Sequence, residues 1–276
     1  MKSMIKIRYT LIYSFFAAIL LLNSGCSDGV SINNINLFSI SDDVQLGAQV
    51  AAEMKQDQQN YPIYNNPQAQ AYVQGIMNEI IKSPLVKYSE SFNYQITIIN
   101  TETVNAFALP GGYIHVYKGL LKYLDNEATL AAILAHEVAH AERRHATKRM
   151  TKAYGAQFLL GMLLGQNPSQ IEEIAGNLVT GLGFLYNSRE DEYEADEYSF
   201  KYLQSTAWYP GAGKLFFEKV GSQTENSDFA ELFSTHPLDQ KRIDALNKLI
   251  NDAHISEPGE HNLFTQRYTE FKSKLY

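Results

Sequence analysis

The sequence predicts an α+β fold that is mainly helical, with a small sheet packed on one long helix. Residues 126–150 contain no Gly or Pro and are rich in helix formers, whereas strict apolar alternation occurs only in short segments near residue 100. Hydrophobic residues make up 45% of the 276-residue chain, enough for a sizeable core in one or two domains. Fibrous and solenoid architectures are excluded, because Gly and Pro are sparse and no period of about 20–50 residues recurs.

The first 25 residues have the pattern of an export signal. Three cations precede an apolar run at 9–22, which is shorter than the ~20 residues that a membrane-spanning helix needs. The run leads to Ser24-Gly25-Cys26, which resembles a bacterial lipobox, although Asn23 departs from the aliphatic residue of that pattern. We therefore expect a signal peptide at 1–25 and lipid on Cys26; ordinary cleavage nearby or an uncleaved anchor are the alternatives.

Cysteine count and charge exclude several classes of protein. Because Cys26 is the single cysteine, an internal disulfide framework and a Cys-based structural zinc site are excluded. The chain carries 23 Lys+Arg and 30 Asp+Glu, a net charge of −7, so nucleic acid is not an expected partner. Residues 26–41 are rich in Ser, Asn and Asp and are interpreted as a tether between the membrane and the domain.

One domain is expected over residues 42–252, followed by a C-terminal tail at 253–276. Apolar residues recur at helical spacing over Asp42–Gln59 and again over Asn66–Lys82, where Pro67 suits a helix start. The domain therefore opens with two predicted helices.

Three strands are expected next. Residues 92–98 alternate strictly between polar and apolar side chains, and the segments 104–109 and 113–117 flank Pro110-Gly111-Gly112, which is typical of a turn. An exposed edge of the 104–109 strand could pair with an extended polypeptide by strand addition. The alternative is a hairpin that merely packs on the following helix.

One long helix is expected from Asn126, a natural N-cap, to about Met150, and it carries the pentapeptide His136-Glu137-Val138-Ala139-His140. Histidines at i and i+4 project from one face, as two imidazole ligands of a tetrahedral zinc ion require, and Glu137 lies at the edge of that face. The pentapeptide alone also fits surface histidines, so a third ligand has to decide. His145 is interpreted as a solvated helix residue.

A later acidic segment, 188–196, offers the third ligand. The metzincin spacing fails, because Arg143 and Ala146 occupy the positions that it requires to be Gly and His. Glu192 and Asp196 stand at i and i+4, so one carboxylate could bind zinc while the other accepts the distal N–H of a ligand histidine. By itself, such a segment is typical of a solvated helix face.

Four motifs resemble, in order and spacing, those of the HtpX/CAAX-prenyl-protease-like zinc metallopeptidase family. They are Asn105–Gly112, His136–His140, Ser188–Asp196, and Ser234–Pro237 with Arg242-Ile243. The resemblance runs from about Asp42 to Ile250 and favours the soluble periplasmic lipoprotein branch of BepA and LoiP type. The chain departs from the family in having neither the helical repeat array of BepA nor the membrane helices of HtpX, so docking through repeats is not expected.

The resemblance implies a gluzincin-type metallopeptidase domain with one zinc ion per chain. His136, His140 and Glu192 match the zinc ligands, Glu137 matches the general base, and Asp196 matches the acid that supports a ligand. Zinc with three protein ligands keeps a position open for water, whose proton Glu137 would take and pass to the leaving amine.

Two classes of function follow. The first is a zinc endopeptidase of the bacterial cell envelope, anchored through Cys26 and facing the periplasm, for which we expect the outer membrane. Its substrates would be misfolded or unassembled envelope proteins. The second is a largely latent zinc-containing chaperone-like or assembly factor that binds polypeptides and rarely cleaves them.

Two further features leave alternatives open. His236 precedes Pro237, which is expected to start a helix over Leu238–Ile250; it could fill the fourth zinc position, donate a hydrogen bond to an oxyanion, or only support the turn. The apolar stretches 154–165 and 171–186 are expected to form a core hairpin, with a lid, a membrane-facing surface or an oligomer contact as alternatives.

Overall fold

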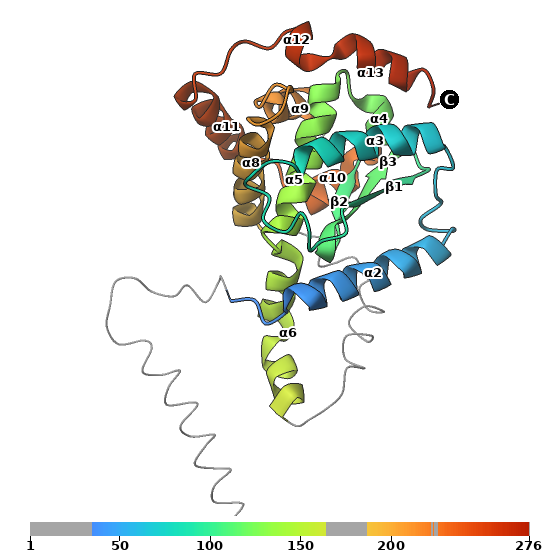
Figure 1. Ribbon diagram of the computed structural model, residues 1–276, viewed down its shortest axis with the longest axis vertical. Helices are drawn as coiled ribbons and strands as arrows, with labels where there is room; N and C mark the ends of the chain where they lie inside the picture. Colours follow the sequence, from blue (N-terminus) through green and yellow to red (C-terminus); the bar gives the residue numbers. More distant parts are fainter. Residues whose placement is uncertain (1–34, 164–186, 222, 224–225, 276) are drawn as a thin grey trace, which may run out of the picture. The chain divides into compact units, whose positions relative to one another are not determined.

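A three-stranded sheet and the long helix that follows it form the centre of the fold (Figure 1). The computed structural model describes residues 35–163, 187–221, 223 and 226–275, and the described residues from Asn36 onwards form one compact unit. The described part is mainly helical with a small sheet, which confirms the predicted fold class. The export signal, the lipobox at Cys26 and most of the tether lie outside the described residues.

The sheet has the strand order β1-β3-β2. Strand β1 (Gln95–Ile99) runs parallel to β3 (Tyr113–Tyr117), and β2 (Ala106–Ala108) pairs antiparallel with β3. The turn at Pro110–Gly112 needs its glycines, because Gly111 has a φ of 71° and a Cβ there would lie 2.8 Å from the Cα of Val44. All three expected strands are present, and their ends differ from the predicted ends by at most a few residues.

Two N-terminal helices cover opposite faces of this sheet. Helix α2 (Ile40–Gln56) begins with a capping box at Ser39 and packs on the face that carries Phe107 and Tyr117. Helix α3 (Pro67–Ile80) begins with proline, as predicted, after the N-cap Asn66, and it packs on the other face together with α5.

The predicted helix over 126–150 is two helices. Helix α5 (Glu127–Glu142) starts at the N-cap Asn126, and α6 (His145–Leu163) follows after a break. At the break Arg144 has a φ of 58°, and its Nη2 donates to the backbone carbonyl of Ser39 at 3.0 Å and to Asp43 Oδ1 at 3.1 Å. The prediction of one helix was wrong because these contacts to a distant segment hold Arg144 in the left-handed region.

The remaining helices surround α5 and the sheet. They are α4 (Lys118–Tyr123), α8 (Arg189–Leu203), α9 (Ala212–Val220), α10 (Ala230–Thr235), α11 (Gln240–Asp252), α12 (Glu260–Leu263) and α13 (Thr265–Lys272). Helix α8 makes the most extensive contact with α5. In the segment expected as a C-terminal tail, Tyr268, Phe271 and Leu275 are buried in the main core.

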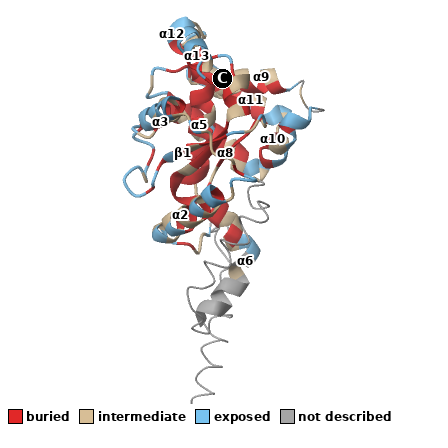
Figure 2. Cartoon of the chain, turned by 90° about the vertical axis from the view of Figure 1, so that its right-hand side faces the viewer, coloured by how far each residue is buried: buried red, intermediate tan, exposed pale blue. Residues whose placement is uncertain are grey.

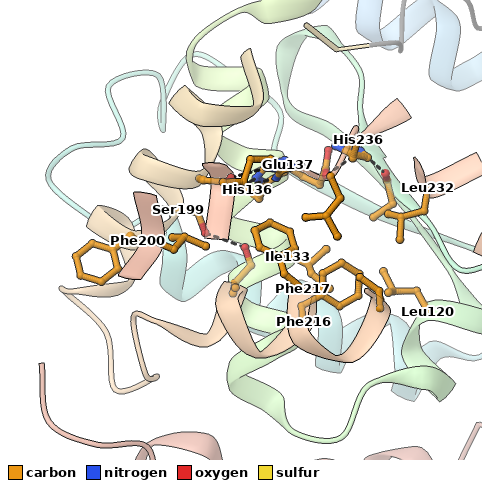
Figure 3. Close-up of a pocket in the computed structure, with 18 of the residues that line it drawn as sticks. Leu120, Ile133, His136, Glu137, Ser199, Phe200, Phe216, Phe217, Leu232 and His236 are labelled. Atoms are coloured by element: carbon orange, nitrogen blue, oxygen red, sulfur yellow. Dashed lines mark hydrogen bonds and ion pairs between the residues drawn. The ribbon is translucent and has the colours of Figure 1, made fainter. Parts of the chain in front are cut away.

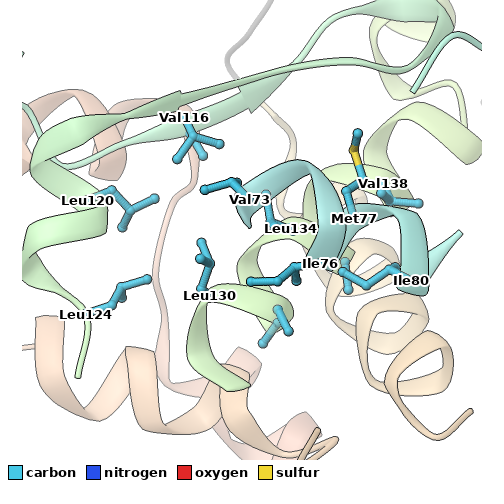
Figure 4. Packing of buried hydrophobic residues seen from close by; sticks show 14 of the residues in the cluster. Val73, Ile76, Met77, Ile80, Val116, Leu120, Leu124, Leu130, Leu134 and Val138 are labelled. Atoms are coloured by element: carbon cyan, nitrogen blue, oxygen red, sulfur yellow. The ribbon is translucent and has the colours of Figure 1, made fainter. Parts of the chain in front are cut away.

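Helix α5 is the centre of the core, and all of its residues except Ile133 are buried (Figure 2). Figure 4 shows Leu130, Leu134 and Val138 of α5 packed between α3 and the sheet. Alanines dominate the rest of α5, so neighbouring helices can approach its backbone closely. Truncating one of these leucines to alanine typically costs about 2–5 kcal/mol, so this packing fixes the orientation of α5 firmly.

The described residues include only part of the segments for which the sequence raised a membrane-facing surface or an apolar hairpin. Among the described residues, no helix combines the length and the hydropathy that crossing a bilayer would demand. Helix α6 contains the first apolar stretch as far as Leu163, whereas residues 164–186, and with them the expected hairpin and its alternatives, lie outside the described residues.

Candidate metal centre

Four ligand-type side chains converge where α5 meets α8. His136 Nε2 and His140 Nε2 lie 2.9 Å apart. The Glu192 carboxylate from α8 lies 3.3 Å from the first of these nitrogens and 3.2 Å from the second. His236, from the loop after α10, places Nδ1 3.1 Å from Glu192 Oε1. The ligand atoms of these four residues all lie within 4.8 Å of one another.

Local signals in the sequence place three of the four members of this cluster, His136, His140 and Glu192. The i and i+4 spacing on α5 stacks the two histidines one turn apart. Ser188 caps α8, accepting from the backbone N–H of Asp191 while Asp191 accepts from the backbone N–H of Ser188, both at 3.1 Å. This capping box fixes where α8 begins, and therefore which of its acidic residues face α5: Glu192 and Asp196 are buried, whereas Glu190 is exposed.

Asp196 and Arg242 hold His136 from behind. His136 Nδ1 lies 2.9 Å from Asp196 Oδ1, and Arg242 donates two hydrogen bonds of 2.7 Å to the Asp196 carboxylate. Burial opposes ionisation of Asp196, but Arg242 outweighs it and lowers the pKa of this carboxyl. An ionised Asp196 can only accept, so the Nδ1 of His136 carries a hydrogen and Nε2 is the ring nitrogen that faces the cluster.

The charges in the cluster suit a cation. Burial opposes ionisation of Glu192, but His236 and Arg242 outweigh it and hold its pKa well below the usual range. Burial and His136 hold the pKa of His140 well below its usual range, whereas Glu192 and Asp196 overcome burial and raise the pKa of His136 to about 10. Two imidazole nitrogens facing each other at 2.9 Å beside a carboxylate repel unless a proton or a metal cation lies between them. The donor set, two histidines and a carboxylate, is one that zinc prefers.

Glu137 lies beside the cluster as a buried acid, and one of its carboxylate oxygens accepts no hydrogen bond from the described residues. Its Oε1 is 3.5 Å from His236 Nε2, and its Oε2 has no hydrogen-bond partner among the described residues. Burial raises the pKa of Glu137, although His236 and His136 oppose this effect. A carboxylate in this state can accept a proton from a group that comes within hydrogen-bond distance of its free oxygen.

His145 is not the solvated residue that the sequence suggested. Its side chain is 1% exposed, with Nδ1 2.8 Å from His140 Nδ1 and Nε2 2.8 Å from Glu194 Oε2. The interpretation was wrong because it assumed an unbroken helix, whereas the break at Arg144 turns His145 towards α8. Sequence reasoning also assigned no role at the site to Glu194, which lies in a segment of similar acids without a distinguishing local signal.

The loop with His236 differs from the prediction at its end. Helix α11 begins at Gln240 with Asp239 as its N-cap, so Pro237 does not start it; the N-cap carboxylate accepts from the backbone N–H of Arg242 at 3.1 Å. His236 is buried, and Asn187 Nδ2 lies 3.4 Å from its Nδ1 and 3.4 Å from His140 Nε2. Asn187, which precedes the acidic motif, is a further site neighbour that the sequence analysis did not single out.

An apolar pocket and a strand edge adjoin the cluster. The pocket has a volume of about 680 Å³ including its open mouth, and Figure 3 shows Ile133, Phe216 and Phe217 lining it while His136, Glu137 and His236 lie at one end. Strand β2 is an edge of the sheet, and its outer side faces the site: the carbonyl oxygen of Ala106 lies 3.2 Å from His236 Nε2. A polypeptide lying along this edge would pass close to Glu137.

Comparison with known proteins identifies a family. The model of peptidase family M48 matches residues 67–250, which confirms the metallopeptidase family expected from the motifs. The family implies a metal ion. Within the described part of the chain, the cluster at the α5–α8 contact could bind it.

Among curated relatives, the beta-barrel assembly-enhancing protease of Escherichia coli (strain K12) is 27% identical over 223 residues, which cover 76% of this chain and 44% of the relative. The mitochondrial metalloendopeptidase OMA1 of Schizosaccharomyces pombe is 30% identical over 187 residues, covering 67% of this chain and 54% of that protein. OMA1 of Arabidopsis thaliana is 31% identical over 168 residues, covering 61% and 33% respectively. The alignments thus span about half or less of these relatives.

Proposed function

The chain belongs to peptidase family M48, and from that premise we propose that it is a zinc-dependent endopeptidase whose active site is the cluster at the α5–α8 contact. The observation that carries the proposal is the convergence of His136, His140 and Glu192 beside Glu137, an acid with an unpartnered buried oxygen among the described residues. Peptide hydrolysis needs these two parts together, a metal-binding set and a base.

We assign zinc to His136, His140 and Glu192. Both histidines would bind through Nε2, because their Nδ1 atoms are engaged by Asp196 and His145. A bound zinc ion supplies Lewis acidity, which lowers the pKa of water towards ~7 and polarises a scissile carbonyl. Asp196, held by Arg242, keeps His136 in the required tautomer and orientation.

Glu137 acts as the general base in this proposal. Its burial raises its pKa, which makes the carboxylate a better proton acceptor than an exposed glutamate. Glu137 would take a proton from the attacking water and then deliver it to the leaving amine. The cleaved bond must therefore lie close to both Glu137 and the histidine pair.

The substrate would be an extended polypeptide that adds to the outer edge of β2. Ala106 and Ala108 direct their backbone groups away from β3, because Asn105 and Leu109 bond to that strand. The outward carbonyl of Ala106 contacts His236 Nε2 at 3.2 Å, so a bound polypeptide would replace this contact. Main-chain pairing of this kind is independent of sequence and makes specificity loose. The pocket beside Ile133, Phe216 and Phe217 would accept one apolar side chain of the bound segment.

His236 has three candidate roles at this site. Its Nδ1 belongs to the ligand cluster, which supports a function as a fourth ligand that keeps the resting enzyme latent. Swung aside, it could instead donate a hydrogen bond to the oxyanion that forms during cleavage. The third role is purely structural, since its Nε2 lies 3.2 Å from the carbonyl oxygen of Ala106.

The setting that we propose is the bacterial cell envelope, with lipid on Cys26 anchoring the domain so that it faces the periplasm, at the outer membrane. The support is the lipobox-like sequence and the similarity to a relative named beta-barrel assembly-enhancing protease. Misfolded or unassembled envelope proteins would be the substrates, as a form of quality control. Mass spectrometry of the mature N-terminus should find lipidated Cys26; a free thiol there would remove the anchor from the proposal.

The second candidate is a largely latent zinc-containing factor that grips polypeptides without cutting them. The position of His236 within the cluster favours it, since a fourth protein ligand would exclude water. The experiment that separates the two is metal analysis of the purified chain together with casein digestion, with and without a chelator. Chelator-sensitive digestion by zinc-containing protein supports the peptidase, whereas zinc-containing protein that binds casein without cutting it supports the latent factor. Absence of zinc would contradict both.

A further inference from the structure

We propose that His145 and Glu194 form a positioning pair that fixes the tautomer and orientation of His140, as Asp196 and Arg242 do for His136. The inference rests on the proposed function, because it treats His140 as a zinc ligand. His145 does not touch substrate or the reacting atoms; it acts through His140.

The direction of each hydrogen bond follows from the Arg143–Glu194 pair, at the end of the series of contacts that runs from His140 through His145. Arg143 holds the Glu194 carboxylate, with Nε 2.8 Å and Nη2 2.7 Å from Glu194 Oε1. The other oxygen, Oε2, lies 2.8 Å from His145 Nε2, and a carboxylate paired with arginine can only accept. His145 therefore carries its hydrogen on Nε2, which leaves Nδ1 with a lone pair.

That lone pair faces the ligand. His145 Nδ1 lies 2.8 Å from His140 Nδ1, so His140 must be the donor in this contact. With its hydrogen on Nδ1, a neutral His140 presents the lone pair of Nε2 to the cluster, which is the form that binds a metal.

The helix break makes this contact possible. In an unbroken helix a residue five positions after His140 would be rotated by about 140° from it and would point elsewhere. Arg144 interrupts the helix with a φ of 58°, and its guanidinium is held by Asp43 and the backbone of Ser39. The strained residue therefore lies directly before His145, whose side chain is 1% exposed. Such a local cost is consistent with a positional requirement at the next residue.

Asparagine and glutamine at position 145 give a matched pair for the test. The side-chain oxygen of asparagine can occupy the position of Nδ1 and accept from His140, whereas the longer amide of glutamine reaches the position of Nε2 and leaves His140 without that acceptor. Both variants remove the imidazole and are neutral. They differ only in which end of His145 they imitate.

The experiment measures zinc affinity of the full-length chain by competition with a chromogenic chelator. We expect His145→Gln to bind zinc roughly 10–100-fold more weakly than wild type, and His145→Asn to recover most of that loss. The absorption spectrum of the cobalt(II)-substituted chain should shift in His145→Gln and resemble wild type in His145→Asn. Melting temperatures in excess chelator give the stability of the metal-free fold and separate a loss of positioning from a loss of folding.

A second pair of variants tests the other residue. Glu194→Ala should also weaken zinc binding, whereas Glu190→Ala, an exposed acid one turn earlier on α8, should not. The inference would be overturned if His145→Gln bound zinc as tightly as wild type. It would also be overturned if His145→Asn and His145→Gln lost the same affinity while Glu194→Ala lost none. Either result would leave the proposed function intact. A wild-type chain that binds no zinc would instead overturn the proposed function and this inference with it.

Discussion

Buried histidines in the described part of the chain lie in two regions with opposite surroundings. His115 on β3 stacks on Phe107, with ring centroids 4.9 Å apart, and its Nδ1 has no hydrogen-bond partner among the described residues. Burial lowers the pKa of His115 to about 4. At the α5–α8 contact, by contrast, His136 and His140 are also buried, but each has a partner at Nδ1. Burial alone therefore does not mark a ligand histidine; the two ligand candidates combine a partner at Nδ1 with an Nε2 that faces the other members of the cluster.

The same difference separates the two regions energetically. Around His115 the packing between α2 and the sheet is apolar, so substitutions there should change the free energy of unfolding and leave metal binding alone. At the α5–α8 contact buried charges compensate one another, as Arg242 does for Asp196 and Glu192. Substitutions there should change metal binding or catalysis first.

The largest expected effect is that of Glu137→Gln. The amide keeps the size of the side chain but cannot accept a proton, so peptidase activity should fall by about 10²–10⁴-fold while zinc content stays unchanged. The measurement is cleavage of a peptide by the purified variant, with metal analysis of the same sample. Near wild-type cleavage would show that another group is the base.

Asp196→Asn should have a smaller effect. The amide oxygen can still accept from His136, but the negative charge that Arg242 compensates is lost, so we expect zinc affinity or activity to fall by roughly 10–100-fold. Asp244→Asn, an exposed aspartate on α11, is the matched control and should behave as wild type. Unchanged metal affinity and rate in Asp196→Asn would show that the charged partner of His136 is not what distinguishes the α5–α8 region from the region around His115.

His236→Ala should change the rate of casein cleavage, and whether the rate rises or falls indicates the role of His236. Because His236 Nδ1 belongs to the ligand cluster, we expect basal casein cleavage to rise several-fold when this side chain is removed. A lower kcat with zinc retained would indicate that His236 stabilises the transition state. No change in rate or metal content would leave it a structural residue.

His115→Phe should have the smallest effect on function and a clear effect on acid stability. The folded-state pKa of about 4 lies below the ordinary value of 6.5, so the unfolded chain binds the proton more readily. Stability is therefore lost as the pH falls from 6.5 to about 4, by up to ~3 kcal/mol.

Phenylalanine keeps the stack on Phe107 and removes this loss, so the unfolding free energy of His115→Phe should depend less on pH in that window. Zinc affinity should stay unchanged. Replacing the exposed His254 with asparagine, which tolerates its φ of 49°, should leave the acid dependence as in wild type. A loss of zinc in His115→Phe would contradict the separation of the two regions.

Local signals in the sequence predicted much of this architecture. Pro67 and Asn126 were readable as helix starts, and the i and i+4 spacings placed candidate ligands on one face of α5 and one face of α8. These features depend on neighbours within one turn, so the sequence contains them in full.

The remaining features depend on contacts between distant segments. The break at Arg144 follows from contacts with Asp43 and Ser39, and the contact of His145 with Glu194 follows from the break. The bidentate pairing of Arg242 with Asp196 likewise joins residues 46 positions apart. Periodicity and capping patterns contain no information about such contacts, so the sequence could not predict them.

Zinc content of Glu192→Ala shows whether the α5–α8 contact holds zinc through Glu192 and the two histidines. The full-length wild type and Glu190→Ala should each retain about one zinc ion per chain, whereas Glu192→Ala should lose most of its zinc because one of three protein ligands is gone. Full zinc occupancy in Glu192→Ala would contradict the account and indicate Glu190 or Glu194 as the ligand instead.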